Sequence, residues 1–223
     1  MSNGSRIWVK ICANTSLEDA QLAAEAGADA VGFVFAPSPR RVSIEQAATI
    51  AARLPAGLEK IGVFVDASLG EVCATVNACG LTGVQLHSAV APGLTAQLRE
   101  RLGAQVGILR VVHFGADAAE QARPIAADPN VDAILVDSCS ATAAGGTGVT
   151  FNWTDARTAL FQNGETRRRL IAAGGLTPDN VREAVAVLRP WGVDVASGVE
   201  AAPGRKDPEK VRRFVAEVRA SAL

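Results

Sequence analysis

Two side chains in this sequence combine the reactivity and the position that acid–base catalysis requires. Cys12 ends the apolar segment WVKIC (8–12), just before the helix-capping run NTS (14–16). Asp137 ends a second apolar segment, AILVD (133–137), at the edge of a low-dielectric core. Burial there raises the pKa of a carboxyl group and suits it to act as a general acid. A thiol close to a helix N-terminus has a lowered pKa and is available as a thiolate.

Both residues also have a purely structural interpretation. A buried free cysteine usually behaves as a small apolar residue, which we expect of Cys73 and Cys79 in a predicted helix. An aspartate after a strand often caps a helix or braces a loop. Cys12 differs because it ends a strand. Asp137 differs because a long, glycine-rich segment follows it at 138–148, and such loops often bind ligands.

Two glycine-containing turns are candidates for a phosphate site. AGG (173–175) and ASG (196–198) each follow an apolar segment and precede a helical one. Small residues leave backbone N–H groups exposed, and a following helix N-terminus favours anions. We therefore expect a phosphorylated small-molecule substrate. The predicted contacts are Gly174, Gly175, Ser197 and Gly198.

Further charged and titratable residues follow other apolar segments. Arg40 and Arg41, in the segment SPRR, have guanidinium groups that bind carboxylates through two hydrogen bonds, but both could equally be surface charges. His87 and His113 are either proton carriers or structural hydrogen-bonding groups. With only two histidines and no closely spaced cysteine pair, we expect no metal site.

The bulk composition excludes several classes of partner. The chain has 223 residues, 48% of them hydrophobic, and a formal net charge of −1, which gives no electrostatic footprint for nucleic acid or anionic lipid. No apolar run approaches the roughly 18 residues of a transmembrane helix, and the N-terminus lacks the apolar core of a signal peptide. The spacing of the four cysteines forms no disulfide framework. We therefore expect a reduced, cytoplasmic protein.

These residues must be positioned by a repeating pattern of strand and helix. Apolar, non-alternating runs are typical of strands buried on both faces of a parallel sheet. The predicted strands are 6–12, 29–35, 60–65, 82–87, 106–113, 132–137, 169–173 and 192–196. Helix-like segments begin near 16, 43, 68, 91, 116, 153, 177 and 207. Ser16, Ser43 and Thr177 are predicted N-caps, the last with Pro178 at the first helical position.

Eight strand–helix units in a chain of this length predict a TIM barrel that forms a single domain over residues 1–223. A doubly wound open sheet uses the same alternation. The absence of a long linker and of a G-x-G-x-x-G motif after the first strand favours the barrel. Active sites of such barrels lie at the C-terminal ends of the strands, often with a phosphate site after strands seven and eight. The candidate residues would all lie at that end.

Taken together, these segments resemble the phosphoribosylanthranilate isomerase family of tryptophan biosynthesis. The resemblance runs from VKICANTSLEDAQLAAEAGADAVGFVFAPSPRRVS through IGVFVD, GVQLH, ILVDS, GGTGVTFNW and AGGLTPDNV to VDVASGVEAAPGRKDPEKVRRF. It implies a single-domain TIM barrel, monomeric or homodimeric. It also implies conversion of N-(5-phosphoribosyl)anthranilate to 1-(2-carboxyphenylamino)-1-deoxyribulose 5-phosphate, an Amadori rearrangement without cofactor or metal.

The resemblance also assigns roles to the candidate residues. The family's catalytic cysteine falls on Cys12, which would be the general base, and its catalytic aspartate falls on Asp137, the general acid. Its carboxylate-binding arginine falls on Arg40, with the adjacent Arg41 as the alternative. Its phosphate contacts fall on the two turns at 174–175 and 197–198. We further predict that the following helix depresses the pKa of Cys12.

Three positions depart from the family pattern: Ala13 and Ser88 replace common glycines, and Asn152 replaces a frequent aspartate. Two other functions remain alternatives. The related sugar isomerase of histidine biosynthesis performs the same rearrangement on a substrate with two phosphates, but its base is an aspartate where this chain has Cys12. A catalytically inactive barrel that serves as a binding module would lack the acid, the base or the phosphate turns.

Overall fold

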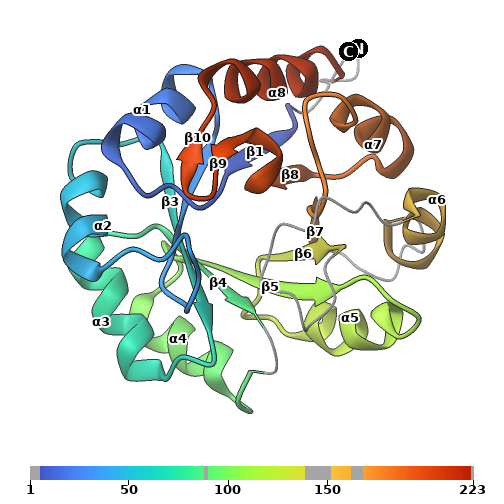
Figure 1. Ribbon diagram of the computed structural model, residues 1–223. Helices are drawn as coiled ribbons and strands as arrows, with labels where there is room; N and C mark the ends of the chain where they lie inside the picture. Colours follow the sequence, from blue (N-terminus) through green and yellow to red (C-terminus); the bar gives the residue numbers. More distant parts are fainter. Residues whose placement is uncertain (1–5, 88–89, 139–151, 162–167, 222–223) are drawn as a thin grey trace.

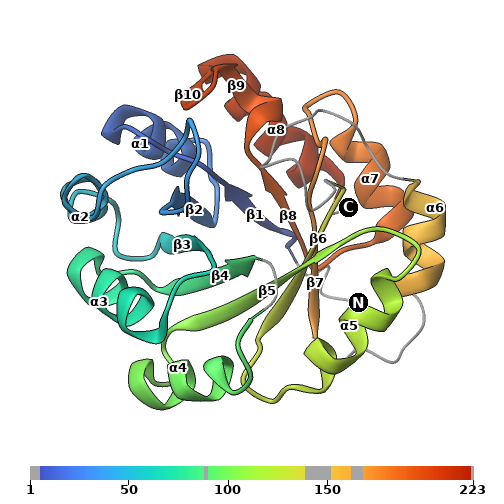
Figure 2. The ribbon, with the colours of Figure 1, turned by 60° about the horizontal axis from the view of Figure 1, so that its bottom comes forward.

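The computed structural model describes residues 6–87, 90–138, 152–161 and 168–221. Within these ranges, eight parallel strands form one closed barrel in the order β1 to β8, and the helices lie outside the ring of strands (Figure 1; Figure 2). The barrel is closed by β1 and β8, which run parallel; Trp8 lies opposite Gly192, and Ile11 lies opposite Val195. The predicted TIM barrel is therefore confirmed, and the open sheet is excluded.

Each strand lies within one of the predicted apolar segments or overlaps it closely. The strands are β1 (Trp8–Ile11), β2 (Ala30–Val34), β3 (Glu59–Val65), β4 (Gly83–His87), β5 (Gly107–His113), β6 (Ala133–Asp137), β7 (Arg169–Ala172) and β8 (Gly192–Val195). Alternate side chains point to opposite faces of the sheet. On β1, Val9 and Ile11 pack outward against the helices, whereas Trp8 belongs to a separate cluster inside the barrel.

The helices are α1 (Leu17–Glu25), α2 (Ile44–Ala51), α3 (Leu69–Cys79), α4 (Leu94–Leu102), α5 (Ala118–Ala127), α6 (Trp153–Ala156), α7 (Val181–Leu188) and α8 (Pro208–Ser221). A π-helical turn, η1 (Arg157–Phe161), continues α6. As predicted, Ser16 and Ser43 accept hydrogen bonds from backbone N–H groups of α1 and α2. Among the described residues, no helix is long and apolar enough to cross a membrane.

The predicted start of α7 at Thr177 is wrong. α7 begins at Val181, after a turn that its own side chains close: the Thr177 backbone N–H donates to Asn180 Oδ1 at 2.8 Å. The Thr177 hydroxyl in turn accepts from the Asp179 N–H at 3.2 Å. Threonine and asparagine hydrogen-bond readily to nearby backbone in turns, and this alternative to a helical turn moves the helix start along the chain.

The structure that follows β8 was not predicted. After β8 the chain forms a 3₁₀ turn, η2 (Ser197–Val199), and a short antiparallel hairpin made of β9 (Glu200–Ala202) and β10 (Arg205–Lys206). The hairpin lies over β1 and β8 in Figure 1, and the Thr15 hydroxyl donates to the Gly204 carbonyl at 2.5 Å. It therefore joins the last barrel strand to the loop after the first.

Candidate active site

Parallel strands bring the ends of β1, β2, β6, β7 and β8 to the same rim of the barrel. Cys12 is the first residue after β1, and Asp137 is the last residue of β6. Arg40 lies in the loop after β2, and the two glycine turns follow β7 and β8. The fold thus brings all the predicted site residues to this rim.

Cys12 is a free, buried thiol fixed by its own backbone and by a glycine on the next strand. Its N–H donates to the Val195 carbonyl at 2.8 Å, and its side chain packs against Val63. A Cβ added to Gly32 on β2 would lie 2.6 Å from Cys12 Sγ, closer than real atoms approach. Gly32 therefore provides the space that the sulfur occupies.

The expectation that the following helix depresses the pKa of Cys12 is wrong. Burial raises the pKa of the thiol, and the charge of Lys10 lowers it only in part. α1 starts at Leu17 and is capped by Ser16, four positions beyond the cysteine. The field of a helix end falls off within about one turn, so this helix contributes little at the sulfur.

Ala13, the residue after Cys12, adopts a left-handed backbone conformation. Its φ is 62°, and it is buried. Only glycine reaches this region without strain, because the Cβ of other residues crowds the following carbonyl. Glycine would adopt this conformation without strain, so with Ala13 this chain accepts backbone strain directly beside the thiol.

Asp137 and Ser138 pack against Gly174, the first glycine of the turn after β7. A Cβ on Gly174 would lie 2.1 Å from Ser138 Oγ and 2.5 Å from Asp137 Oδ1, and the φ of this glycine is +78°. Asp137 itself is half-buried and pairs in register with His113 of β5. The general-acid candidate and one candidate phosphate turn are thus in direct contact. The rest of the predicted loop, 139–148, lies outside the described residues.

The two candidate phosphate turns also touch each other. A Cβ on Gly198 would lie 1.8 Å from the carbonyl oxygen of Leu176, so only glycine permits this approach. Gly175 has a φ of +64°, and its carbonyl accepts a hydrogen bond from Asn180 Nδ2 at 2.9 Å. The turns after β7 and β8 therefore form one continuous backbone surface.

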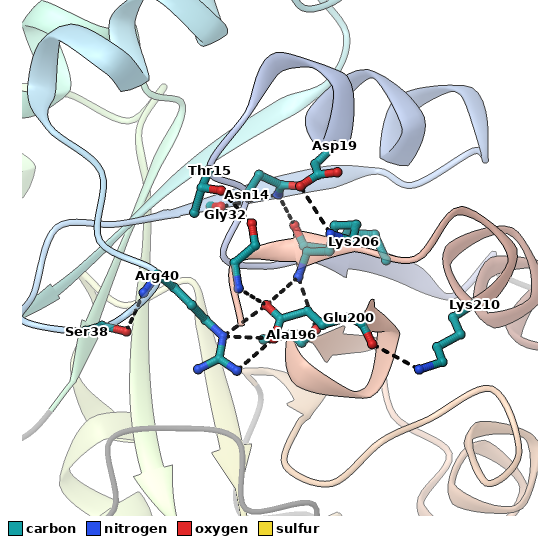
Figure 3. Close-up of polar contacts among 12 residues, drawn as sticks. Asn14, Thr15, Asp19, Gly32, Ser38, Arg40, Ala196, Glu200, Lys206 and Lys210 are labelled. Carbon is teal, nitrogen blue, oxygen red and sulfur yellow. Dashed lines mark hydrogen bonds and ion pairs between the residues drawn. The ribbon is translucent and has the colours of Figure 1, made fainter. Parts of the chain in front are cut away.

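Arg40 is largely buried and forms a forked ion pair with Glu200, the first residue of β9 (Figure 3). Its Nε donates to Oε1 at 2.9 Å and to Oε2 at 3.1 Å, and Nη2 donates to Oε2 at 2.7 Å. Figure 3 shows the remaining nitrogen, Nη1, turned away from Glu200. Arg41 is exposed and lines a cavity of about 420 Å³ with Phe35 and Asp66 instead.

Glu200 is a functional candidate that the sequence analysis missed. Besides Arg40, its Oε1 accepts from Lys206 Nζ at 3.3 Å and from the Gly204 N–H at 3.3 Å. Burial alone would raise the pKa of this carboxyl, but Arg40 and Lys206 outweigh it and lower the pKa. The ammonium of Lys206 also donates to the Ala196 carbonyl at 3.1 Å, which links the cluster to the end of β8.

Lys10 is the second missed residue. Its side chain is 0% exposed inside the barrel, and Nζ donates to Gln85 Oε1 and Asp194 Oδ1, each at 2.9 Å. The signal was present in the sequence, because Lys10 alternates with Trp8 and Cys12 along one strand and must share their interior face. Its partners on β4 and β8 could be known only once the barrel was closed.

The two histidines lie beside this interior network. Gln85 Nε2 and His87 Nε2 are 2.8 Å apart, and the His87 and His113 rings are 6.2 Å apart. Burial, with smaller effects of Lys10 and His113, lowers the pKa of His87 to about 4, so this ring is neutral near pH 7. His113 Nδ1 is buried without a hydrogen-bond partner among the residues that the structure describes.

Two other departures from the family pattern have different outcomes. Asn152 caps α6: its Oδ1 accepts from the Thr154 N–H at 3.0 Å and the Asp155 N–H at 3.3 Å. This cap needs only a side-chain oxygen, so asparagine replaces aspartate without loss. Ser88 lies outside the described residues.

Comparisons with known proteins agree over almost the whole chain. The family model for N-(5′-phosphoribosyl)anthranilate (PRA) isomerase matches residues 9–217. An N-(5′-phosphoribosyl)anthranilate isomerase of Citrifermentans bemidjiense is 46% identical over 216 residues, which cover 96% of this chain and 98% of that protein.

Two solved structures share the fold closely. One is a phosphoribosylanthranilate isomerase in complex with reduced 1-(o-carboxyphenylamino)-1-deoxyribulose 5-phosphate; it has a TM-score of 0.80 and 35% identity. The other contains mutually generated monomers of the dimeric enzyme of Thermotoga maritima, with a TM-score of 0.79 and 35% identity. Each alignment covers 96% of this chain and 99% of the solved chain.

Proposed function

The chain belongs to the N-(5′-phosphoribosyl)anthranilate isomerase family, and we propose that Cys12 and Asp137 are the general base and general acid of its reaction. The enzyme converts N-(5-phosphoribosyl)anthranilate to 1-(2-carboxyphenylamino)-1-deoxyribulose 5-phosphate, an Amadori rearrangement in tryptophan biosynthesis. The observation that carries the assignment of roles is the position of Cys12 after β1 and Asp137 at the end of β6, on one rim of a closed barrel.

Asp137 would begin the reaction by opening the sugar ring. The furanose oxygen must gain a proton as its bond to C1 breaks, and the amine nitrogen supplies the electron pair that forms the C1=N bond. A carboxylic acid at the rim is a suitable proton donor. The contact of Asp137 with Gly174 supports this role, because it holds the acid beside the proposed phosphate site.

Cys12 would remove the C2 proton of the Schiff base. The electron pair of that C–H bond then forms C1=C2, and the C1=N π electrons return to nitrogen, which gives an enolamine. The enolamine tautomerises to the ketone. Only the thiolate form of Cys12 has the basicity for this step, so the charges around the sulfur decide how much active enzyme is present at a given pH.

Arg40 would bind the carboxylate of the anthranilate ring. Glu200 occupies the Nε–Nη2 edge of the guanidinium, which leaves the Nη1–Nη2 edge with hydrogen-bond donors for a second carboxylate. The exposed position of Arg41 favours Arg40 for this role. The phosphate would bind to backbone N–H groups of the turns containing Gly174, Gly175, Ser197 and Gly198.

The acid and base roles are tested by turnover of the fluorescent anthranilate ribosyl substrate with Cys12→Ser and Asp137→Asn. Each change removes a proton-transfer group, so we expect kcat to fall by about 10²- to 10⁴-fold with circular dichroism spectra unchanged. Cys73→Ser, a half-buried cysteine of α3, is the matched control and should retain wild-type turnover. Near-wild-type kcat in both site variants would reject this mechanism.

We also propose that the enzyme works as a monomer or a homodimer in the cytoplasm, without cofactor or metal. The free thiols of Cys12, Cys73 and Cys79 are compatible with a reducing compartment. Sedimentation equilibrium of the purified chain would separate monomer from dimer. Unchanged turnover after treatment with a metal chelator is the expected result for cofactor-free catalysis.

A further inference from the structure

The barrel interior contains a buried cation that the reaction steps above do not use. Lys10 is fully enclosed, and its ammonium is held between Asp194 of β8 and Gln85 of β4 at 2.9 Å each. A charge in this position is costly unless it is paired, and exchange of a buried ion pair for apolar side chains is often neutral or stabilising. Stability alone therefore gives a weak reason for an ammonium at the centre of the barrel.

Lys10 lies next to the thiol. Cys12 follows β1 two positions after Lys10, and the alternation of side chains along the strand places both on the same face. Gly32 of β2 touches both: a Cβ there would lie 2.6 Å from Cys12 Sγ and 3.0 Å from Lys10 Cε. A single glycine thus allows the lysine side chain and the sulfur to pack together in the barrel.

Charged groups face the sulfur from several elements. Lys10 of β1 and Lys206 of β10 lower the pKa of Cys12, whereas burial and Asp194 of β8 raise it. The Arg40 guanidinium, in the loop after β2, also interacts with the charge of the thiolate. Among these charges, Lys10 has the largest effect on the thiol.

Lys10 keeps its charge inside the barrel. Burial lowers the pKa of its ammonium, but Asp194 and the Cys12 thiolate outweigh burial, and the pKa of Lys10 is raised. His87 lies nearby, and its pKa of about 4 makes it neutral near pH 7. The lysine is therefore a permanent cation beside a thiol whose pKa is raised by burial.

We propose that Lys10, held in place by Asp194 and Gln85, is a positioning residue that favours the thiolate form of Cys12. The proposal rests on the proposed function only in that Cys12 is taken as the base. Lys10 opposes the effect of burial on the thiol without cancelling it, and so increases the fraction of thiolate that the reaction can use. In this arrangement the positive charge near the sulfur is the Lys10 ammonium inside the barrel. The dipole of α1 is not needed to stabilise the thiolate.

The test is a titration of Cys12 in the full chain with Cys73, Cys79 and Cys139 replaced by serine. The ultraviolet absorbance of the thiolate is followed against pH and does not depend on access of a reagent to the buried sulfur. Removal of a neighbouring charge typically shifts a pKa by about one unit or more, so Lys10→Met should move the midpoint up by at least about one pH unit. The acid limb of kcat/KM should move up with it.

Lys60→Met is the matched control. Lys60 is also buried, but within the part of the chain that the structure describes its ammonium donates only to the Leu58 and Pro55 carbonyls, at 3.2 and 3.4 Å. This variant should leave the Cys12 midpoint unchanged. If Lys10→Met does not fold, the double variant Lys10→Met/Asp194→Asn removes both charges. Its midpoint should still rise, because the lowering effect of Lys10 exceeds the raising effect of Asp194.

The outcomes separate this inference from the proposed function. An unchanged Cys12 midpoint in a folded Lys10 variant, single or double, would overturn the inference and leave the assignment of the base intact. A shifted absorbance midpoint with an unshifted kcat/KM profile would support the coupling of Lys10 to Cys12 and reject Cys12 as the base.

Discussion

The Arg40 guanidinium donates hydrogen bonds to both carboxylate oxygens of Glu200, with N–O distances of 2.7 to 3.1 Å. Both side chains are almost completely shielded from solvent. The two residues are 160 positions apart in the sequence. Because Glu200 fixes one edge of the guanidinium plane, the orientation of the other edge is set before any ligand arrives. A preorganised donor pair loses little conformational entropy on binding a carboxylate.

The first prediction concerns Arg40 and Arg41. Loss of a charge-assisted hydrogen-bonding group costs about 1.5–3 kcal/mol, so Arg40→Ala should raise KM by about 10- to 100-fold, with a smaller effect on kcat. Arg41→Ala should leave KM within about twofold, since surface charges contribute little. Steady-state kinetics with the carboxylated substrate and with an analogue that lacks the ring carboxylate provide the measurement. A loss of affinity for both substrates in Arg40→Ala would contradict carboxylate binding.

The second prediction concerns the pH dependence of stability. Arg40 and Lys206 lower the pKa of Glu200 in the folded state against the effect of burial. A carboxyl group with a depressed folded pKa contributes stability above its unfolded pKa of about 4.3, and loses it as pH falls through the folded value. The stability difference between wild type and Glu200→Gln should therefore be largest near pH 7 and shrink below about pH 4.

Urea unfolding across this pH range measures that difference. Glu183→Gln, on the exposed side of α7, is the control for a glutamate outside the cluster and should give a small difference at every pH. A difference for Glu200→Gln that stays constant with pH would show that packing, rather than charge, accounts for the effect.

The third prediction concerns the strained residue beside the thiol. Ala13 has a φ of 62°, so Ala13→Gly should raise the free energy of unfolding by about 1 kcal/mol. Ala74→Gly, at an exposed position of α3, should lower it by a similar amount, about 0.5–1 kcal/mol, because the helix already suits alanine. Urea unfolding of both variants should show changes of opposite sign in the free energy of unfolding. Destabilisation by Ala13→Gly would mean that the methyl group contributes more packing than strain.

The fourth prediction concerns the phosphate turns. Gly198→Ala would place a Cβ 1.8 Å from the Leu176 carbonyl, so the turns after β7 and β8 must separate. We expect KM to rise by at least about tenfold and inorganic phosphate to inhibit less strongly, since the backbone donors lose their alignment. Gly70→Ala, where a Cβ meets nothing within 4 Å, is the matched control and should retain wild-type KM. Equal phosphate inhibition in Gly198→Ala and wild type would remove these turns from the proposed phosphate site.

Much of the fold could be predicted from the sequence, because the signals that determine strands and helix starts are local. Apolar runs define the eight strands, and Ser16 and Ser43 form the caps that their positions predict. The barrel rule then brings Cys12 and Asp137 to one rim. The start of α7 was misjudged because Thr177 has two local hydrogen-bonding options, and the turn with Asn180 is the one observed.

The ionic groups of the site were missed for the opposite reason. In the sequence, nothing distinguishes Glu200 from an ordinary surface glutamate. Only the folded barrel and the β9–β10 hairpin bring Arg40 and Lys206 into contact with it. The pKa of Cys12 could not be judged from the capping run alone. It depends on burial and on Lys10, whose own partner Asp194 is 184 positions away.

The pairing of β1 with β8 also has a consequence for the order in which the enzyme is made. Lys10 is synthesised 184 positions before Asp194, the carboxylate on β8 that neutralises it. Until then, a barrel interior assembled from the earlier strands would enclose an uncompensated ammonium, which is strongly unfavourable. The Lys10 ammonium can be paired only after β8 has been synthesised and has joined β1.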